Sequence, residues 1–178
     1  MWVITMDYNN IQLMNEDLVR VTADEVTQLE QVLNTRMPRG YKEYVTTLGI
    51  GILNDTVRVY SPMRIQQEYR DFQNRWSESY FWDKGTDLLT KDRVLESIII
   101  ADTGNGDELI FHPSAPDRLY VLPIDYEEIF LTGGSLDEAI EWILEGGVLD
   151  SNEDDEDEEE IERPEGWYFE PFPSDVMG

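Results

Sequence analysis

Residues 102–107 come nearest, among the polar stretches of this chain, to a motif with known chemistry. They contain two aspartates, an asparagine and two glycines, Gly104 and Gly106. A calcium loop places Asp or Asn at its third and fifth positions, and both positions are glycine here. Glycine and asparagine accept positive φ, and an aspartate accepts hydrogen bonds from nearby backbone N–H groups. The pattern therefore favours a tight turn over a calcium site or a phosphate-binding loop.

The chain contains a single histidine, His112, at the end of an expected strand. Catalysis by a Ser–His–Asp set needs an activated serine beside the imidazole, and no nucleophile-elbow motif is present. A zinc site needs several His or Cys ligands, and the chain has no cysteine. We therefore expect a hydrogen-bonded structural histidine, no metal and no cofactor.

Neighbouring acids such as Glu127 and Glu128, or Asp137 and Glu138, have the residue types of a glycosidase dyad. With 39 acids in the chain, adjacency by chance is expected. The second pair also falls where carboxylates stabilise the start of a helix. We therefore expect no catalytic residue and no enzyme. An enzyme that acts through carboxylates alone, probed at Asp102 and Asp107, is the alternative.

Negative charge is the strongest global feature. Thirty-nine acids against thirteen bases give a net charge of −26 and an isoelectric point near 4.1. Residues 150–178 contain thirteen of the acids and one base, so residues 1–149 still have a charge of −14. Such a field repels phosphate backbones and attracts a cationic partner, which excludes nucleic acid as the expected ligand. Solubility alone is the other explanation of the charge.

Nothing in the sequence indicates a membrane or secreted protein. No apolar run approaches the roughly 18 residues that a membrane-spanning helix needs. The N-terminal residues lack the basic region of a signal peptide and soon become polar. With no cysteine available for disulfides, we expect a cytoplasmic protein.

The elements that position these residues centre on 97–112. Ile98, Ile99 and Ile100 form a β-branched run typical of a buried strand, and the apolar run resumes at 109–111 after the glycine turn. This pattern predicts a hairpin at the centre of a sheet. Residues 57–60 and 119–122 are expected as further strands.

Four amphipathic helices are expected around that sheet. Thr22 and Glu25 form a capping box before a helix over 23–34, and Pro38 is expected to start the next helix. Ser61 and Pro62 begin a third helix that runs to about residue 79, and a second capping box at 135–138 begins the last one. Strands that follow each other closely, with helices between some of them, predict an α+β fold with a mainly antiparallel sheet.

Both ends of the chain differ from this body. Residues 2–6 and 11–14 are short β-like runs that predict either an added hairpin or a single edge strand. Residues 153–160 are eight consecutive acids, which repel one another and bury no surface, so we expect them to be solvated. The aromatic segment at 167–172 is expected either to dock back on the domain or to act as a short binding peptide. The chain accordingly divides into a domain at 1–149, with its core at about 22–146, and a tail at 150–178.

The order of these motifs resembles that of the SUKH superfamily, which includes bacterial immunity proteins and a fungal regulator of cell-wall synthesis. The resemblance covers about residues 22–146. It rests on the capped helix with Leu29-Glu30, on Met37-Pro38 followed by Tyr41 and Tyr44, on Gly49 and Gly51, on the 99–107 segment, and on the helix that begins at Ser135.

The resemblance implies a fold without catalytic activity and, for bacterial members, an antidote that binds and blocks a toxin, often a nuclease. A nuclease holds phosphates and so tends to have a basic cleft, which an acidic binder finds quickly by electrostatic steering. We therefore expect a bacterial immunity protein that occludes the basic active site of a cognate toxin. The fungal relatives suggest the alternative, a regulatory or scaffold module.

The expected partner contacts combine aromatic anchors near the end of the third helix with acids that mimic phosphates. The candidate residues are Trp76, Tyr80, Trp82, Asp83, Asp102, Asp107 and Glu108.

Overall fold

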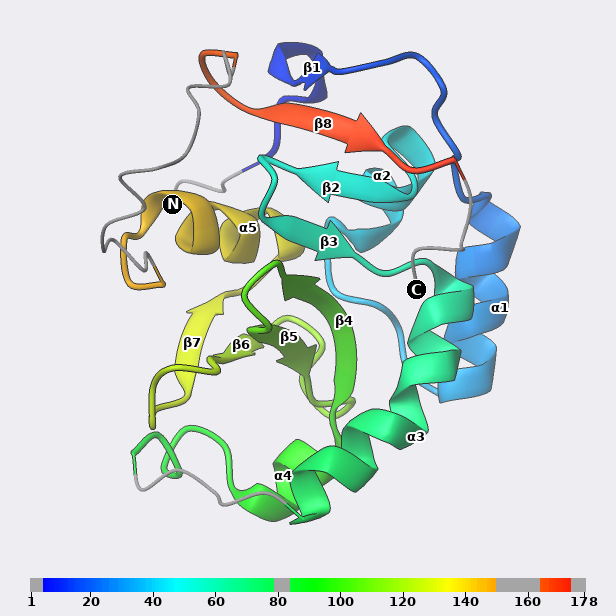
Figure 1. The fold of residues 1–178 in the computed structure, drawn as a ribbon. Coiled ribbons are helices and arrows are strands. Elements are labelled where there is room, and N and C mark those ends of the chain that lie inside the picture. The colour runs from blue at the N-terminus through cyan, green and yellow to red at the C-terminus, as the bar shows by residue number, and fades with distance from the viewer. Residues whose placement is uncertain (1–4, 79–83, 150–163, 174–178) are drawn as a thin grey trace.

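The computed structural model describes residues 5–78, 84–149 and 164–173. Within them the fold is α+β, as predicted, with eight strands in one mainly antiparallel sheet (Figure 1). The strands lie in the order β1-β8-β2-β3-β4-β5-β6-β7. Their bounds in chain order are β1 Gln12–Leu13, β2 Gly51–Leu53, β3 Val57–Val59, β4 Ile98–Thr103, β5 Glu108–Phe111, β6 Leu119–Leu122, β7 Phe130–Gly133 and β8 Tyr168–Pro171.

The predicted hairpin is present as β4 and β5, which pair antiparallel inside the sheet. The register slips between Ile99 and Ala101, where a bulge lets two residues of β4 face one of β5. The turn between the strands contains Gly106 at φ +99°, the left-handed conformation that the sequence of the turn indicates. The hairpin is buried along most of its length, and Ile98, Ile99 and Ile100 are at most 2% exposed.

The helices confirm most of the predicted positions and correct some boundaries. Their bounds are α1 Ala23–Leu33, α2 Tyr41–Thr47, α3 Pro62–Glu78, α4 Lys91–Glu96 and α5 Leu136–Glu145. The capping box of Thr22 and Glu25 forms with both of its hydrogen bonds. However, α2 begins at Tyr41, with Gly40 in the left-handed conformation before it, and not at Pro38. A single 3₁₀ turn, Tyr8–Asn10, precedes β1.

Three short elements are absent from the sequence prediction. Strand β2 contains a glycine, β7 ends in one, and α4 has six residues with one buried side chain, Val94. Strand β2 and helix α4 contain less than two repeats of their hydrophobic period, and β7 has one buried side chain, Thr132, so none of them shows a clear pattern.

The aromatic segment at the end of the chain docks on the domain as β8. It lies between β1 and β2, parallel to β1 and antiparallel to β2. Phe169 is fully buried, and its ring meets that of Tyr44 edge-on with centroids 6.3 Å apart. Of the two alternatives for this segment, docking is therefore the one that the structure shows. The eight-acid run lies outside the described residues.

The two faces of the sheet differ in chemistry because side chains alternate along each strand. On one face a cross-strand row joins Val59, Ala101, Leu109 and Val121, all of them buried. On the other face the next cross-strand row consists of one base, Arg58, and two acids, Asp102 and Glu108. Helix α3 contributes polar side chains to this face. The described ranges contain no helix with the length and apolar character needed to cross a bilayer.

Candidate functional site

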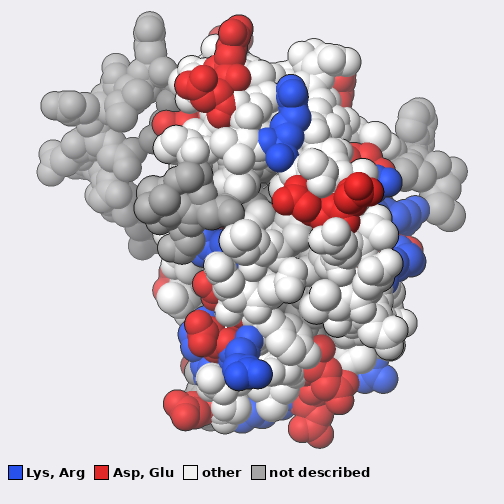
Figure 2. Space-filling view, turned by 90° about the vertical axis from the view of Figure 1, so that its right-hand side faces the viewer, with Lys and Arg blue, Asp and Glu red and all other residues white. Residues whose placement is uncertain are grey.

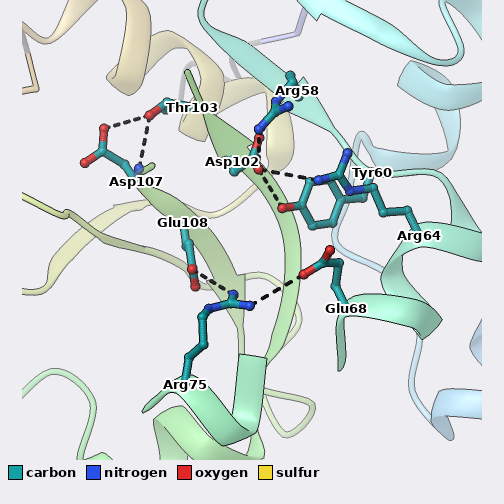
Figure 3. Close-up of polar contacts among 9 residues, drawn as sticks. All are labelled: Arg58, Tyr60, Arg64, Glu68, Arg75, Asp102, Thr103, Asp107 and Glu108. Carbon is teal, nitrogen blue, oxygen red and sulfur yellow. Dashed lines mark hydrogen bonds and ion pairs between the residues drawn. The ribbon is translucent and has the colours of Figure 1, made fainter. Parts of the chain in front are cut away.

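The polar face of the sheet presents a row of charged residues at consecutive strand positions. Arg58 on β3 pairs with Asp102 on β4, which pairs in turn with Glu108 on β5. Residues directly opposite each other on neighbouring strands project to the same side. Helix α3 adds Arg64, Glu68, Arg75 and Trp76 to this row, and β3 is followed by Tyr60. We call these eight residues the α3 cluster, most of which is drawn in Figure 3.

Asp102 is the most heavily bonded carboxylate of the α3 cluster. Arg58 donates from Nε and Nη2 to its two oxygens at 2.7 and 2.8 Å, which is a bidentate pair. The hydroxyl of Tyr60 donates to the same carboxylate at 2.7 Å, and Arg64 lies 3.8 Å away. The Arg64 guanidinium also stacks 4.2 Å from the centre of the Tyr60 ring. Burial, and next the negative charge of Asp102, raise the pKa of Tyr60, so its hydroxyl keeps its proton and remains a donor.

Glu108 joins the sheet to the second half of α3. Its carboxylate accepts from Nη2 of Arg75 at 2.9 Å and from the indole N–H of Trp76 at 3.0 Å. Arg75 also lies 3.6 Å from Glu68, which is two turns earlier on the same face of α3. Burial raises the pKa of Glu108, and the hydrogen bonds from Trp76 and Arg75 act against that shift.

The α3 cluster is balanced in charge, with three guanidinium groups facing three carboxylates. Both oxygens of Asp102 and both oxygens of Glu108 accept hydrogen bonds from the protein itself. Both carboxylates are therefore occupied by donors of the protein itself. What the geometry does is fix α3 on the sheet.

Asp107 lies outside this row, in the turn between β4 and β5, and its carboxylate has a structural role. It is 5% exposed. Thr103 donates from Oγ1 to Asp107 at 2.7 Å, and the backbone N–H of Ile124 donates to its other oxygen at 3.0 Å. The carboxylate thus joins the β4–β5 turn to the segment after β6.

Of the seven candidate contact residues, the structure brings Trp76, Asp102 and Glu108 together in the α3 cluster. It places Asp107 apart from them, in the turn. Tyr80, Trp82 and Asp83 lie outside the described residues.

His112 is hydrogen-bonded on both ring nitrogens. Nε2 lies 2.7 Å from the carboxylate of Glu96, and Nδ1 lies 2.7 Å from the hydroxyl of Ser114. The backbone N–H of Ser114 also donates to Nδ1 at 3.1 Å, so the contact closes a local turn. Ser114 and Glu96 are exposed to solvent, without the water-excluded surroundings in which a nucleophilic serine is activated. Among the described residues, no group of three or more His, Cys, Asp or Glu is arranged to hold a metal ion.

An exposed loop between β6 and β7 was not among the predicted contact residues. Ile124 is 62% exposed and Tyr126 is 41% exposed, and they alternate with the exposed acids Asp125 and Glu127. We call residues 124–127 the acidic loop. The signal in the sequence was an isoleucine and a tyrosine among acids directly after a strand-ending proline, which is unusual for a purely solvating loop.

The acidic loop lies beside the segment that follows α3. The backbones of Lys84 and Glu128 form an isolated parallel β-bridge. A Cβ on Gly85 would come within 2.7 Å of the backbone of Ile129. Gly85 also has φ +85°, so a glycine is required there on both counts. Residues 84 and 85, which follow the candidate contact Asp83 in sequence, are thus held against residues 128 and 129, directly after the acidic loop.

Among the described residues, acids greatly outnumber bases, with 27 acids and 12 bases. Ion pairs between described residues join arginines to four of those acids, Glu68, Asp102, Glu108 and Asp117. Figure 2 shows both signs of charge on the side of the molecule where α1 and α3 lie, separated by broad uncharged surface. That side is therefore mixed, and the excess of acid is not gathered on it.

Comparison with known protein families gives a match. The family model of the SMI1 / KNR4 family (SUKH-1) matches residues 20–142, which is more than half of the chain. The match begins just before the capping box of α1 and ends within α5. No curated protein matches the chain.

Proposed function

The chain belongs to the SMI1 / KNR4 family (SUKH-1), and from this premise we propose that it is an immunity protein that binds and neutralises a cognate toxin. Members of the SUKH superfamily are generally non-catalytic immunity or regulatory proteins that act through protein partners. The proposal adds that the partner is a basic protein, a bacterial nuclease met in the cytoplasm, and that binding blocks its active site.

The excess of acid carries this proposal. Even without the eight-acid run, the described residues have 27 acids against 12 bases, and few of the acids are neutralised by arginine. A nuclease presents a basic cleft to its substrate, and a protein of opposite charge is steered toward that cleft. Binding there would exclude the nucleic acid both by bulk and by charge.

We propose that the contact surface combines the acidic loop with the end of α3. The acidic loop offers apolar side chains between acids that are free of arginine partners within the described residues. Trp76 is the aromatic member of the α3 cluster, and the candidate contacts Tyr80, Trp82 and Asp83 follow it in sequence. Interfaces of this kind place aromatic or aliphatic anchors at their centre and charges around them. Asp102 and Glu108 would position α3 and not contact the toxin with free charge.

The direct test is neutralisation of a toxin encoded beside this protein. The two proteins are mixed and the nuclease activity is measured as the immunity protein is added. We expect inhibition at a ratio near one to one, and an association rate that falls steeply as salt is raised, because exposed charges are screened. An absence of inhibition and of binding at low salt, for every neighbouring toxin, would contradict the proposal.

The regulatory alternative makes a different prediction for the acidic run at 153–160. If that run is the working part, replacing its eight acids by neutral Ser and Gly would abolish function while β8 stays in place. If the domain neutralises a toxin, the same variant keeps its inhibition and loses only part of the association rate. The replacement is a better test than deletion of residues 150–178, because deletion also removes β8.

A further inference from the structure

A second site is built from different elements, where the N-terminal segment crosses the starts of α2 and α5. A cavity of about 360 Å³ is open there to solvent. It is lined by Thr5, Tyr8, Arg39, Gly40, Glu43, Ser135 and Asp137. Another cavity, of about 300 Å³, adjoins Thr5 and Asp137 and extends to Glu141.

Asp137 lies between these cavities with half of its carboxylate unused. The residue is 8% exposed, and its Oδ2 accepts a hydrogen bond from the backbone N–H of Met6 at 3.0 Å. Its Oδ1 is buried and has no hydrogen-bond partner. Buried polar atoms are nearly always paired, so an unpaired carboxylate oxygen facing a cavity indicates a missing donor.

Two tyrosine hydroxyl groups near this cavity are also buried without a hydrogen-bond partner. The hydroxyl oxygens of Tyr8 and Tyr44 are buried without a partner. Burial, and next the negative charge of Asp137, raise the pKa of Tyr8, while burial and then Tyr8 raise the pKa of Tyr44. These groups are therefore close enough to influence one another, and all of them remain unsatisfied.

Gly40 packs directly against the unpaired oxygen. Its φ is +90°, and a Cβ at this position would lie 2.6 Å from Oδ1 of Asp137. Any other residue would press on the carboxylate and would also strain the backbone. The turn before α2 therefore needs a glycine where it passes the Asp137 carboxylate.

The acids around the cavity make it negatively charged, which favours a cation as the ligand. Glu43 and Asp137 line it, and Asp7 and Glu141 line the adjoining one. Arg39 is the base on the wall, but its side chain is directed elsewhere: it lies 3.6 Å from Asp117 and donates to the carbonyl of Gly134. Burial, with smaller effects of Glu43 and Glu138, raises the pKa of Asp137, although the hydrogen bond from Met6 acts against it. A bound cation would stabilise the charged form of the Asp137 carboxylate.

We propose that this pocket binds the guanidinium group of an arginine side chain supplied by a partner protein. Guanidinium has five N–H donors in one plane, which suits a carboxylate oxygen, a rim glutamate and a tyrosine hydroxyl that are all acceptors. The site is distinct from the acidic loop and does not depend on the identity of the toxin.

The test is an NMR titration of the full chain with ethylguanidinium as the probe. We expect saturable shifts of the amide signals of Met6, Gly40 and Asp137, with a dissociation constant on the order of 1 mM for so small a ligand. Asp137→Asn keeps an acceptor for Met6 and turns the free carboxylate oxygen into an amide, so binding should weaken about tenfold or more. Glu43→Gln at the exposed rim should weaken it to a smaller extent.

Glu16→Gln is the matched control, because Glu16 is an exposed acid outside both cavities. It should change the affinity less than twofold. Shifts that do not saturate, or equal affinity in wild type, Asp137→Asn and Glu43→Gln, would overturn the proposal and leave a hydrated pocket only. Ethylammonium tested in parallel decides the group: equal or tighter binding of ethylammonium would overturn the assignment to arginine. Because Glu43→Gln changes an exposed side chain, the test remains decisive if Asp137→Asn fails to fold.

Discussion

At Asp102 a single carboxylate is shared by Arg58, Tyr60 and Arg64, and its side chain is 12% exposed. Asp102→Ala removes the acceptor and leaves Arg58 partly buried without its bidentate partner. We expect a loss of about 2 to 4 kcal/mol in the free energy of unfolding. Urea denaturation measures it.

Asp92→Ala is the control for that variant, because Asp92 is an exposed acid on the surface of α4. It should change stability by no more than about 0.5 kcal/mol. Equal effects of the two variants would mean that the α3 cluster contributes nothing to holding α3.

Asp137 gives a prediction about pH. Its pKa in the folded protein is raised above 3.8 by burial, so the folded state binds the proton more tightly than the unfolded state does. The free energy of unfolding therefore decreases as pH rises from the unfolded value through the folded one, and the decrease is complete above it. Asp137→Asn lacks this proton, so its stability relative to wild type should increase over the same interval.

The measurement is urea denaturation of both proteins at several pH values from about 3 to 7. A constant difference between them would show that burial does not penalise the charged form of Asp137. The comparison also reports on the arginine pocket, since an occupying guanidinium should reduce the difference near neutral pH.

Sequence reasoning at the scale of residues succeeded where bonds are local and failed where they are not. The capping box of Thr22 and Glu25 spans three residues, and both of its hydrogen bonds form. Asp102 and Glu108 were selected for their charge, but their arginine partners come from β3 and α3, up to 44 positions away. Pairing across a sheet depends on register, which single residue types do not reveal.

At the scale of elements, the notable feature is β8 between β1 and β2. A Cβ on Gly51 would lie 2.4 Å from the carbonyl oxygen of Glu170 and 2.4 Å from the ring of Phe169. Strand β8 therefore packs against a glycine that no larger residue can replace. The sequence predicted an aromatic segment here, but not which edge of the sheet would accept it, because β2 was itself too short to predict.

Phe169→Ala tests how far β8 stabilises the domain. The ring is fully buried against Tyr44, so its removal leaves a cavity and should cost about 3 to 5 kcal/mol. Phe172→Ala is the control, because Phe172 is only half-buried and follows the strand. It should cost clearly less in thermal or chemical unfolding. If Phe169→Ala were as stable as wild type, β8 would contribute nothing to the stability of the domain and would not be part of its core.

At the scale of the whole molecule, charge is the property that acts at a distance. The acidic loop should contribute to the rate of association with a basic partner more than to the lifetime of the complex, since its acids are exposed. Replacing Asp125 and Glu127 by lysine should lower the association rate several-fold at low salt, and the difference should shrink in about 0.5 M salt. Stopped-flow or surface-based kinetics with the toxin measures it.

The same two changes at Asp24 and Asp92, exposed acids on α1 and α4, are the control for position. They alter the net charge equally. A similar loss of rate from both pairs would show that the total charge matters and that the acidic loop has no special place in the contact.

Strand β8 also fixes when the protein can finish folding. Among the described strands it comes last in the chain, yet it fills a slot between the first two, so the slot stays empty until residues 168–171 have left the ribosome. Until then the backbone N–H and C=O groups of β2 on that side face water, as an open edge that another nascent chain can extend. Products of interrupted translation would keep that edge permanently and should be the forms of this protein that aggregate first.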